Sequence, residues 1–404
     1  MSNCTTLNDP TVIVSAARTP LGAFQGELSA LSAAQLGATA IRAALQRTGA
    51  DTLPVDEVLM GCVLLAGQGQ APARQAALAA GLPRSVPCTT ISKVCGSGMK
   101  ALMLADDMLR GGSARIIVAG GMESMSNAPY LLAKGRGGYR MGHDRLFDHM
   151  MMDGLEDAYD IASDGSRRSM GTFGEQCATK YEFTRASQDV FAIESVRRAQ
   201  QAAAAGAFDD EIAPVTIADK RGDITIRTDE SPRKIKTEKI AALKPAFKQG
   251  GTITAASSSS INDGAAALVL MRESTARALD LAPLARVLGH ASHAQEPSWF
   301  TTAPIGALQK LFDNIGWQPG DVDLYEINEA FAVVPMAVMA DLGITRDRIN
   351  VHGGACALGH PIGASGARIV VTLLHALRRR GQRRGIASLC IGGGEATAMA
   401  IEAF

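Results

Sequence analysis

The sequence SKVCGSGMKAL, residues 92–102, joins a predicted strand to a predicted helix through a cysteine and two glycines. An apolar, β-rich approach begins at Cys88 and ends at Cys95, and Leu102 and Leu109 then follow at helical spacing. The glycines permit a sharp turn and leave room for a substrate near the sulfur. At a helix start, free backbone N–H groups and the helix dipole favour a thiolate. Cys95 is therefore a candidate nucleophile, with a buried structural cysteine as the alternative.

The overall composition is that of an ordinary globular protein, with 47% hydrophobic and 20% charged residues in 404 positions. This length predicts two or three domains. Forty basic residues balance forty acidic ones, and only 4% of residues are aromatic, so we expect neither nucleic acid nor an acidic membrane as a partner. No signal peptide or membrane-spanning run is evident, which predicts a cytoplasmic protein. Seven scattered cysteines without a CxxC pair favour free thiols over disulfides or a zinc site.

Short apolar strands alternate with helices along most of the chain, which is typical of a layered α/β fold with a mainly parallel sheet. We predict strands at residues 11–16, 88–94, 115–119, 266–271, 284–289, 324–327, 348–351, 386–391 and 396–401, and a further strand within 55–65. We predict helices at residues 32–47, 73–80, 187–205, 305–315, 330–341 and 365–380. The last part of the chain repeats the order of the first: strand, reactive turn, helix, strand.

The composition changes in the middle of the chain, where charge and methionine become more frequent. The methionines at 150–152 are typical of core packing or an oligomer contact. The basic stretch at 233–236 is typical of a solvated face, but it could also bind a phosphate-bearing ligand. We therefore expect two similar halves with an inserted loop domain. Their boundaries are 1–126 plus 260–281 for the N-terminal half, 127–259 for the insertion and 282–404 for the C-terminal half.

The turn GGACALGHPIGASGAR, residues 353–368, places His360 among five glycines. A histidine that only packs in a core has no need of such surroundings. The glycines and Pro361 hold the imidazole on a rigid loop at the start of a helix, where it could deprotonate a thiol. Cys356 in the same turn occupies an apolar position, which indicates packing.

Two further turns carry candidate site residues. Cys390 ends an apolar strand just before Gly392 and two more glycines, whose free backbone N–H groups could form an anion hole. A buried strand end is an equally good reading of Cys390 alone. Asn328 lies between a predicted strand and a predicted helix. It could cap that helix, or it could orient a water or carbonyl beside the histidine.

Taken together, four segments resemble the thiolase family over nearly the full length of the chain. They are VCGSG at 94–98, NEAF at 328–331, GHPIG at 359–363 and CIGGG at 390–394, in the family's order and spacing. The resemblance implies a five-layered αβαβα sandwich of two similar halves. It also implies an inserted loop domain that holds coenzyme A, and a homo-oligomer, either a dimer or a tetramer.

The resemblance also implies a mechanism with two cysteines. Cys95, deprotonated by His360, becomes acylated by an acyl-CoA, and Cys390 then removes an α-proton from a second acetyl-CoA. His360 and a water held by Asn328 would bind the enolate oxygen, while the N–H groups of Cys95 and Gly392 would bind the acyl oxygen. Acyl transfer and carbanion formation need a nucleophile and a separate base. No metal or redox cofactor is implied, since coenzyme A thioesters are the substrates.

Five more residues are implied to contact the substrate. Ser259 would contact the pantetheine and Arg233 would lie near the nucleotide, while Met170, Phe300 and Phe331 would line the acyl pocket. The chain departs from the family at or beside three of these residues. Ser169 stands where short-chain members carry histidine, Phe300 where other members carry methionine, and the serines at 257–260 where Asn-Ala-Ser-Gly is more usual.

The leading hypothesis is an acetyl-CoA C-acetyltransferase of fatty acid metabolism that converts two acetyl-CoA reversibly into acetoacetyl-CoA and CoA. A degradative thiolase acting on longer or branched 3-oxoacyl-CoA is the near alternative. A decarboxylating condensing enzyme would use two histidines, or a histidine and an asparagine, in place of His360 with Cys390. A non-catalytic acyl-CoA-binding protein would have no need of Cys95, His360 and Cys390 together.

Overall fold

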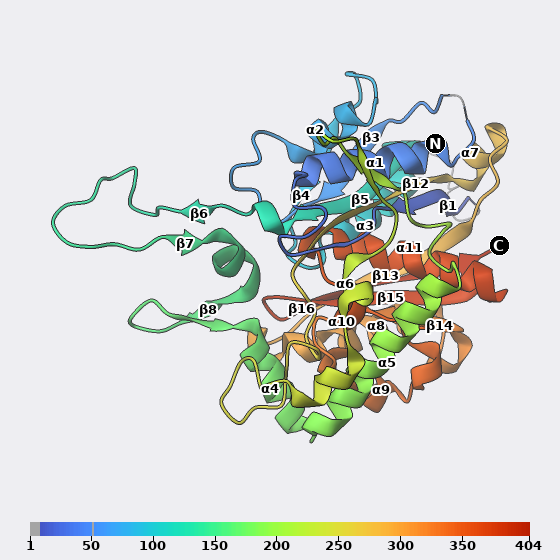
Figure 1. Cartoon of the computed structure of the whole chain (residues 1–404). Coiled ribbons are helices and arrows are strands. Elements are labelled where there is room, and N and C mark those ends of the chain that lie inside the picture. The colour runs from blue at the N-terminus through green and yellow to red at the C-terminus, as the bar shows by residue number, and fades with distance from the viewer. Residues whose placement is uncertain (1–8, 51) are drawn as a thin grey trace.

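The computed structural model describes residues 9–50 and 52–404, and a large sheet runs through its centre (Figure 1). Within the described residues, no helix is both long enough and apolar enough to span a membrane. The strands of the sheet are β1 (Thr11–Arg18), β2 (Gly22–Ala23), β3 (Glu57–Gly61), β4 (Cys88–Ile91), β5 (Ile116–Ser124), β12 (Asn262–Arg272), β13 (Ala285–Ala294), β14 (Leu324–Ile327), β15 (Arg384–Ile391) and β16 (Glu395–Ala403). Their order is β14-β15-β16-β13-β1-β12-β5-β3-β4, with β2 beside β12.

The predicted mainly parallel sheet is wrong, because most neighbouring strands run antiparallel. Antiparallel pairs join β1 to β12 and β13, β12 to β5, β13 to β16, and β15 to β16. Only β3–β4, β3–β5 and β14–β15 are parallel. Parallel neighbours need a crossover, usually a helix, whereas β15 and β16 are joined by the short glycine turn at 392–394. The alternation of strands and helices in the sequence does not reveal such direct returns.

Strand β1 lies in the middle of the sheet, with β12 on one side and β13 on the other. Its sequence TVIVSAAR begins with four β-branched residues, and all eight residues are buried. It pairs with β12 along its length, but with β13 only through Val12 opposite Arg286 and Ile13 opposite Ala285. This short pairing is the seam between the strands of the two halves.

Helices cover both outer faces and also fill the space between the halves. Helices α3 and α11 contact strands of both halves and each other. Helices α1 and α2 contact the N-terminal strands, α8 contacts the C-terminal ones, and α9 packs against α8. This arrangement confirms the predicted layered α/β sandwich (Figure 1). The bounds are α1 (Ala33–Gln46), α2 (Pro72–Ala79), α3 (Ser97–Gly111), α7 (Glu273–Ala278), α8 (Ala303–Ile315), α9 (Val333–Leu342), α10 (Ala355–Leu358) and α11 (Ile362–Arg380).

The two central helices pack backbone against backbone. A methyl group on Gly98 of α3 would lie 2.8 Å from the backbone nitrogen of Ala367, and one on Gly366 of α11 would lie 2.3 Å from that of Met99. Real side chains do not tolerate such distances, so glycine sets how closely α3 and α11 approach.

The chain between β5 and β12 adds no strand to the central sheet, and part of it projects from the body in Figure 1. The buried Arg18 of β1 holds the segment by ion pairs to Glu211 (2.5 Å) and Asp229 (2.7 Å). The boundaries at 127 and 259 remain a prediction. Its elements are β6 (Tyr130–Leu131), β7 (Phe147–Asp148), β8 (Glu156–Ile161), β9 (Arg167–Ser169), α4 (Met170–Lys180), α5 (Arg185–Ala204), β10 (Val215–Ile217), β11 (Ile224–Ile226) and α6 (Glu230–Lys234).

One predicted strand, residues 348–351, does not form. The side chain of Asn350 accepts from the backbone N–H of Ile327 (2.8 Å) and donates to its carbonyl (2.8 Å). A side chain therefore makes the contacts with β14 that a strand ladder would make, and only a single bridge joins Tyr325 to Ile349. The predicted strands and helices elsewhere are present, with ends shifted by a few residues, and α4 was not predicted.

Candidate active site

The turn that carries Cys95 is held in an unfavourable backbone conformation. Val94 has φ of +45°, a region that β-branched residues rarely adopt. The hydroxyl of Ser97 accepts from the backbone N–H of Lys93 (2.8 Å) and donates to the carbonyl of Val94 (2.6 Å), which stabilises the bend. Cys95 stands just before Gly96, the residue that precedes the first turn of α3. The predicted position of the cysteine at a helix start is confirmed.

The expected thiolate is not the resting form of Cys95. Burial raises the pKa of the thiol to about 11, although a hydrogen bond from the backbone N–H of Gly392 favours the charged form. The N–H groups at the start of α3 therefore stabilise the thiolate less than burial destabilises it. A base must take the proton before the sulfur can attack an acyl carbon.

His360 has the protonation state that such a base needs. Burial, and after it the charge of Arg368, lowers the pKa of the imidazole to about 3. Its Nδ1 lies 2.5 Å from the hydroxyl of Ser365, which donates its one proton to the carbonyl of Pro361 (3.0 Å). The hydroxyl must then accept from Nδ1, which leaves the lone pair on Nε2. This buried Nε2 has no hydrogen-bond partner within residues 9–50 and 52–404.

Asn328 lies beside the histidine. Its amide nitrogen is 3.5 Å from Nδ1 of His360, and its buried Oδ1 has no partner in the described part of the chain. The capping alternative for Asn328 is wrong, because α9 begins only at Val333. The neighbouring Glu329 is fully buried and accepts from Ser195 Oγ (2.6 Å), so the turn itself is fixed.

Cys390 lies within β15, one residue before the strand ends, and its side chain is buried. Burial, with Cys95 as the next cause, raises the pKa of Cys390 well above its ordinary value. A methyl group on Gly96, next to Cys95, would lie 2.3 Å from Cδ1 of Ile391, next to Cys390, so the two cysteine turns pack together. Gly392 lies between the two sides of the site: a methyl group on it would lie 3.6 Å from Cε of Met170 and 3.7 Å from Cγ1 of Val94. An ion pair from Lys93 to Glu395 ties the two cysteine turns together.

Aromatic rings form an apolar wall in the cluster that contains Cys390. The ring centroids of Phe300 and Phe331 are 6.4 Å apart, those of Phe247 and Phe331 5.7 Å, and those of Phe173 and Phe300 6.2 Å. Phe173 and Phe247 were missed in the sequence. Phe173 belongs to the unpredicted helix α4, and Phe247 follows a loop whose pattern gives no signal.

The two residues expected to contact coenzyme A have different neighbours. The backbone N–H of Ser259 donates to the carbonyl of Ala330 (2.9 Å), next to Phe331. Arg233 instead pairs with Glu27 (2.7 Å) and lines another hollow. A hollow of about 520 Å³ also opens near the serine run; its lining includes Lys234, Lys236, Lys239, Ala255, Ala256 and Ser260.

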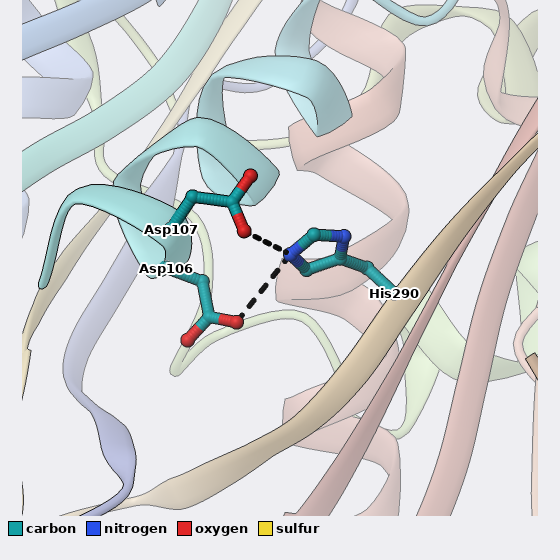
Figure 2. Close-up of side chains that lie close together, drawn as sticks. All are labelled: Asp106, Asp107 and His290. Atoms are coloured by element: carbon teal, nitrogen blue, oxygen red, sulfur yellow. Dashed lines mark ion pairs between the residues drawn. The ribbon is translucent and has the colours of Figure 1, made fainter. Parts of the chain in front are cut away.

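One cluster in the described residues has side chains suited to a metal ion, and it lies away from these turns. Figure 2 shows Nε2 of His290 between the carboxylates of Asp106 (3.4 Å) and Asp107 (3.3 Å). Asp106 also pairs with Arg110 (2.9 Å). Its pKa is lowered: burial opposes the charge, but the interactions with His290 and Arg110 outweigh it. We interpret the cluster as an ion-pair network between α3 and β13.

The comparisons with known sequences agree with the resemblance. Residues 11–274 match the family described as "Thiolase, N-terminal domain", and residues 281–403 match "Thiolase, C-terminal domain". An acetyl-CoA acetyltransferase from Cupriavidus necator is 49% identical over 97% of this chain and 98% of its own length. One from Escherichia coli is 49% identical over 100% of this chain and 99% of its own.

Solved structures have the same fold. The Bacillus anthracis acetyl-CoA acetyltransferase superposes with a TM-score of 0.94 at 41% identity, covering 98% of this chain and 99% of that one. A thiolase from Ascaris suum in complex with coenzyme A gives a TM-score of 0.91 at 42% identity, covering 98% and 100%.

Proposed function

The chain belongs to the thiolase family, and we propose that it is an acetyl-CoA C-acetyltransferase that joins two acetyl-CoA reversibly into acetoacetyl-CoA and CoA. One observation carries the proposal at the level of atoms. His360 Nε2 and Asn328 Oδ1 are both buried and without a partner in the described residues. Buried polar atoms are almost always paired, so two such atoms in one site favour a polar ligand there.

In the first half-reaction we assign the nucleophile to Cys95. Nε2 of His360 takes the thiol proton and the sulfur bonds to the acetyl carbon. The CoA sulfur leaves as a thiol with the proton of Cys390, which becomes a thiolate, while His360 stays protonated. The neutral imidazole supports this role, because a protonated ring could not accept. The N–H of Gly392 already faces the sulfur and is suited to hold the oxygen of the tetrahedral intermediate, together with the N–H of Cys95.

In the second half-reaction we assign the base to Cys390. Its thiolate removes an α-proton from a second acetyl-CoA, and the carbanion bonds to the acetyl carbon on Cys95 as the C–S bond breaks. The protonated Nε2 of His360 and a water held by Asn328 would bind the enolate oxygen. The departing sulfur of Cys95 then takes its proton from His360, and Cys390 keeps the α-proton, so both thiols and the neutral imidazole are restored. The close packing of the two cysteine turns, Gly96 against Ile391, supports the action of both sulfurs in one site.

We propose that the aromatic wall limits the acyl chain and that the lysine-lined hollow takes the phosphates of coenzyme A. Phe300 and Phe331 fill space beside Cys390, with Met170 near Gly392. The three lysines supply positive charge, and Ser259 stays our candidate for the pantetheine. Arg233 keeps its predicted place near the nucleotide only as a proposal, since Glu27 already neutralises it.

The assembly and location also stay proposals. The projecting segment exposes a set of large apolar side chains: Tyr130, Leu132, Met141, Leu146, Tyr159 and Ile161. Such a surface supports contact with another copy, as a dimer or tetramer. Light scattering on the purified chain gives the state directly. We also keep the proposals of a cytoplasmic location, a role in fatty acid metabolism and chemistry without a cofactor.

The mechanism is tested by intact mass after incubation with acetyl-CoA. We expect the parent to gain one acetyl group, Cys95→Ser to gain none, and Cys390→Ser to be acetylated but unable to condense. Labelling of Cys95→Ser at the parent's level would contradict the assigned nucleophile.

Chain length is tested separately. Thiolysis of acetoacetyl-CoA is compared with thiolysis of a medium-chain 3-oxoacyl-CoA. We expect a preference for the short substrate, because four phenylalanines crowd the apolar wall. A clear preference for the longer chain would favour the degradative alternative.

A further inference from the structure

A fully buried carboxylate connects the loops on either side of the site. Glu123, at the end of β5, is 0% exposed. Its Oε2 accepts from the backbone N–H groups of Val63 (3.0 Å) and Gly363 (2.9 Å). Its Oε1 accepts from the backbone N–H of Leu64 (3.2 Å) and lies 3.5 Å from Sγ of Cys62.

These donors belong to two loops from different halves of the molecule. Val63 and Leu64 follow β3, whereas Gly363 comes three residues after His360, at the start of α11. Val63, Leu64 and Ile362 form one apolar cluster, and Cys95 packs against it. Glu123 therefore connects the residues beside Cys95, Val63 and Leu64, to the loop that carries His360.

The fit at this junction leaves little freedom. A methyl group on Gly363 would lie 2.8 Å from Oε2 of Glu123, and one on Gly121 would lie 2.1 Å from the carbonyl of Gly363. The loop of His360 thus rests directly on the end of β5. Burial raises the pKa of Glu123 to about 7, although the backbone N–H groups of Leu64, Gly363 and Val63 favour the charged form. When Glu123 is ionised, above that pH, its charge-assisted hydrogen bonds fix the junction more strongly than apolar contact does.

We propose that Glu123 is a positioning residue. It fixes the loop of His360 against Val63 and Leu64, in the apolar cluster on which Cys95 packs, and so sets the geometry of thiol proton transfer. This inference rests on the proposed function. Small misplacements of reacting groups cost about a hundredfold in rate. Glu123 contacts no reacting atom, so its effect should fall on the acetylation rate and leave the affinity for coenzyme A unchanged.

Two substitutions separate the reach of the side chain from its charge. Glu123→Asp keeps the charge but is one methylene too short to hold both loops. Glu123→Gln loses the charge and the acceptor for the N–H of Leu64, but keeps an oxygen that accepts from both Val63 and Gly363, so it still joins the two loops. Asp56→Asn is the matched control, since Asp56 accepts from two backbone N–H groups, those of Arg115 and Ile116, at the far end of β5.

The measurements are the rate of Cys95 acetylation at saturating acetyl-CoA, by rapid-quench intact mass, and the dissociation constant of CoA, by calorimetry. We expect Glu123→Asp to acetylate about a hundredfold more slowly. Glu123→Gln should stay within about tenfold of the parent and Asp56→Asn should match it, with the CoA constant within about twofold throughout. Should Glu123→Asp fail to fold, Glu123→Met fills the same space without an acceptor and should show the same loss.

Three results would overturn the proposal: a parental rate in Glu123→Asp, equal losses in the Asp and Gln variants, or a rate loss matched by weaker CoA binding. A parent that is never acetylated would instead contradict the proposed function. In that case the alkylation rate of Cys95 by iodoacetamide, which needs no substrate, carries the same comparison between the variants.

Discussion

The two central helices, α3 and α11, each begin two residues after a reactive side chain, but the preceding turns are built differently. Before α3, the strained residue is Val94, with φ of +45°. Before α11 the residue with a positive φ is Gly359 (+105°), which glycine adopts without strain, and the side chain of Asn262 occupies the space that a Cβ would need. Cys95 and His360 thus occupy corresponding places in two similar halves.

The comparison teaches that one environment has opposite effects on two kinds of group. Burial disfavours charge, so it raises the pKa of the thiol to about 11 and lowers that of the imidazole to about 3. Both groups therefore rest uncharged. The site stores a proton donor and an acceptor in neutral form, and charge develops only when the substrate arrives.

The largest expected effect comes from replacing His360, the proton acceptor. His360→Asn should slow acetylation of Cys95 by about 10³-fold, or about 4 kcal/mol, because the thiol loses its base. Rapid-quench intact mass measures the rate, with Asp56→Asn as a control outside the site. A loss smaller than tenfold would show that another group takes the proton.

The next effect concerns Cys95, the proton donor, and the pH dependence of its alkylation. Because the pKa of Cys95 is raised, the thiol stays protonated at neutral pH, and alkylation by iodoacetamide should rise through pH 9 with a midpoint near 11. In the urea-unfolded chain the midpoint should return to about 8.5, a difference worth about 3 kcal/mol. A folded-state midpoint below 8.5 would mean that the helix start outweighs burial.

A smaller effect tests how closely the two helices must pack. Gly366→Ala brings a methyl group to 2.3 Å from the backbone of Met99, so α3 and α11 must separate. We expect a loss of about 2 kcal/mol in the free energy of unfolding, measured by urea titration.

Gly111→Ala is the matched control for this packing, because a methyl group there meets nothing within 4 Å. It should leave stability unchanged or raise it by about 0.5–1 kcal/mol. Equal effects of the two substitutions would contradict close packing as the cause.

The smallest effect concerns the ion pair between Lys93 and Glu395, both partly exposed. Lys93→Met should cost less than about 1 kcal/mol and the difference should shrink at high salt, as for other surface pairs. Urea titrations at two salt concentrations measure it. A larger cost, insensitive to salt, would show that the tie between the two cysteine turns is more than a surface contact.

Much of the fold could be predicted from local patterns. The glycine turns at 96, 359 and 392 and the β-branched residues of β1 have local physical causes, so strands, helices and reactive turns were found. Strand direction depends on which strands meet, and the chain does not show that locally. The strand predicted at 348–351 does not form for the same reason: it depends on a neighbour distant in sequence. The side chain of Asn350 can replace a strand ladder only when β14 lies beside it.

The candidate site was predicted in its residues but not in its electrostatics. The structure brings Cys95, Cys390 and Gly392 together and sets Asn328 beside His360. The neutral thiol was missed because burial is a property of the whole fold. Glu123 and Phe247 were missed because their partners, such as Gly363 and Phe331, are distant in sequence.

The central place of β1 has a consequence for synthesis on the ribosome. This strand emerges long before its partners on both sides, because β12 and β13 begin only at residues 262 and 285. At a translation rate of about 5–20 residues per second, β1 waits on the order of 10–50 s for a neighbour. During that time its apolar side chains are an open target for chaperones and for other nascent chains, so early translation is the vulnerable period for this protein.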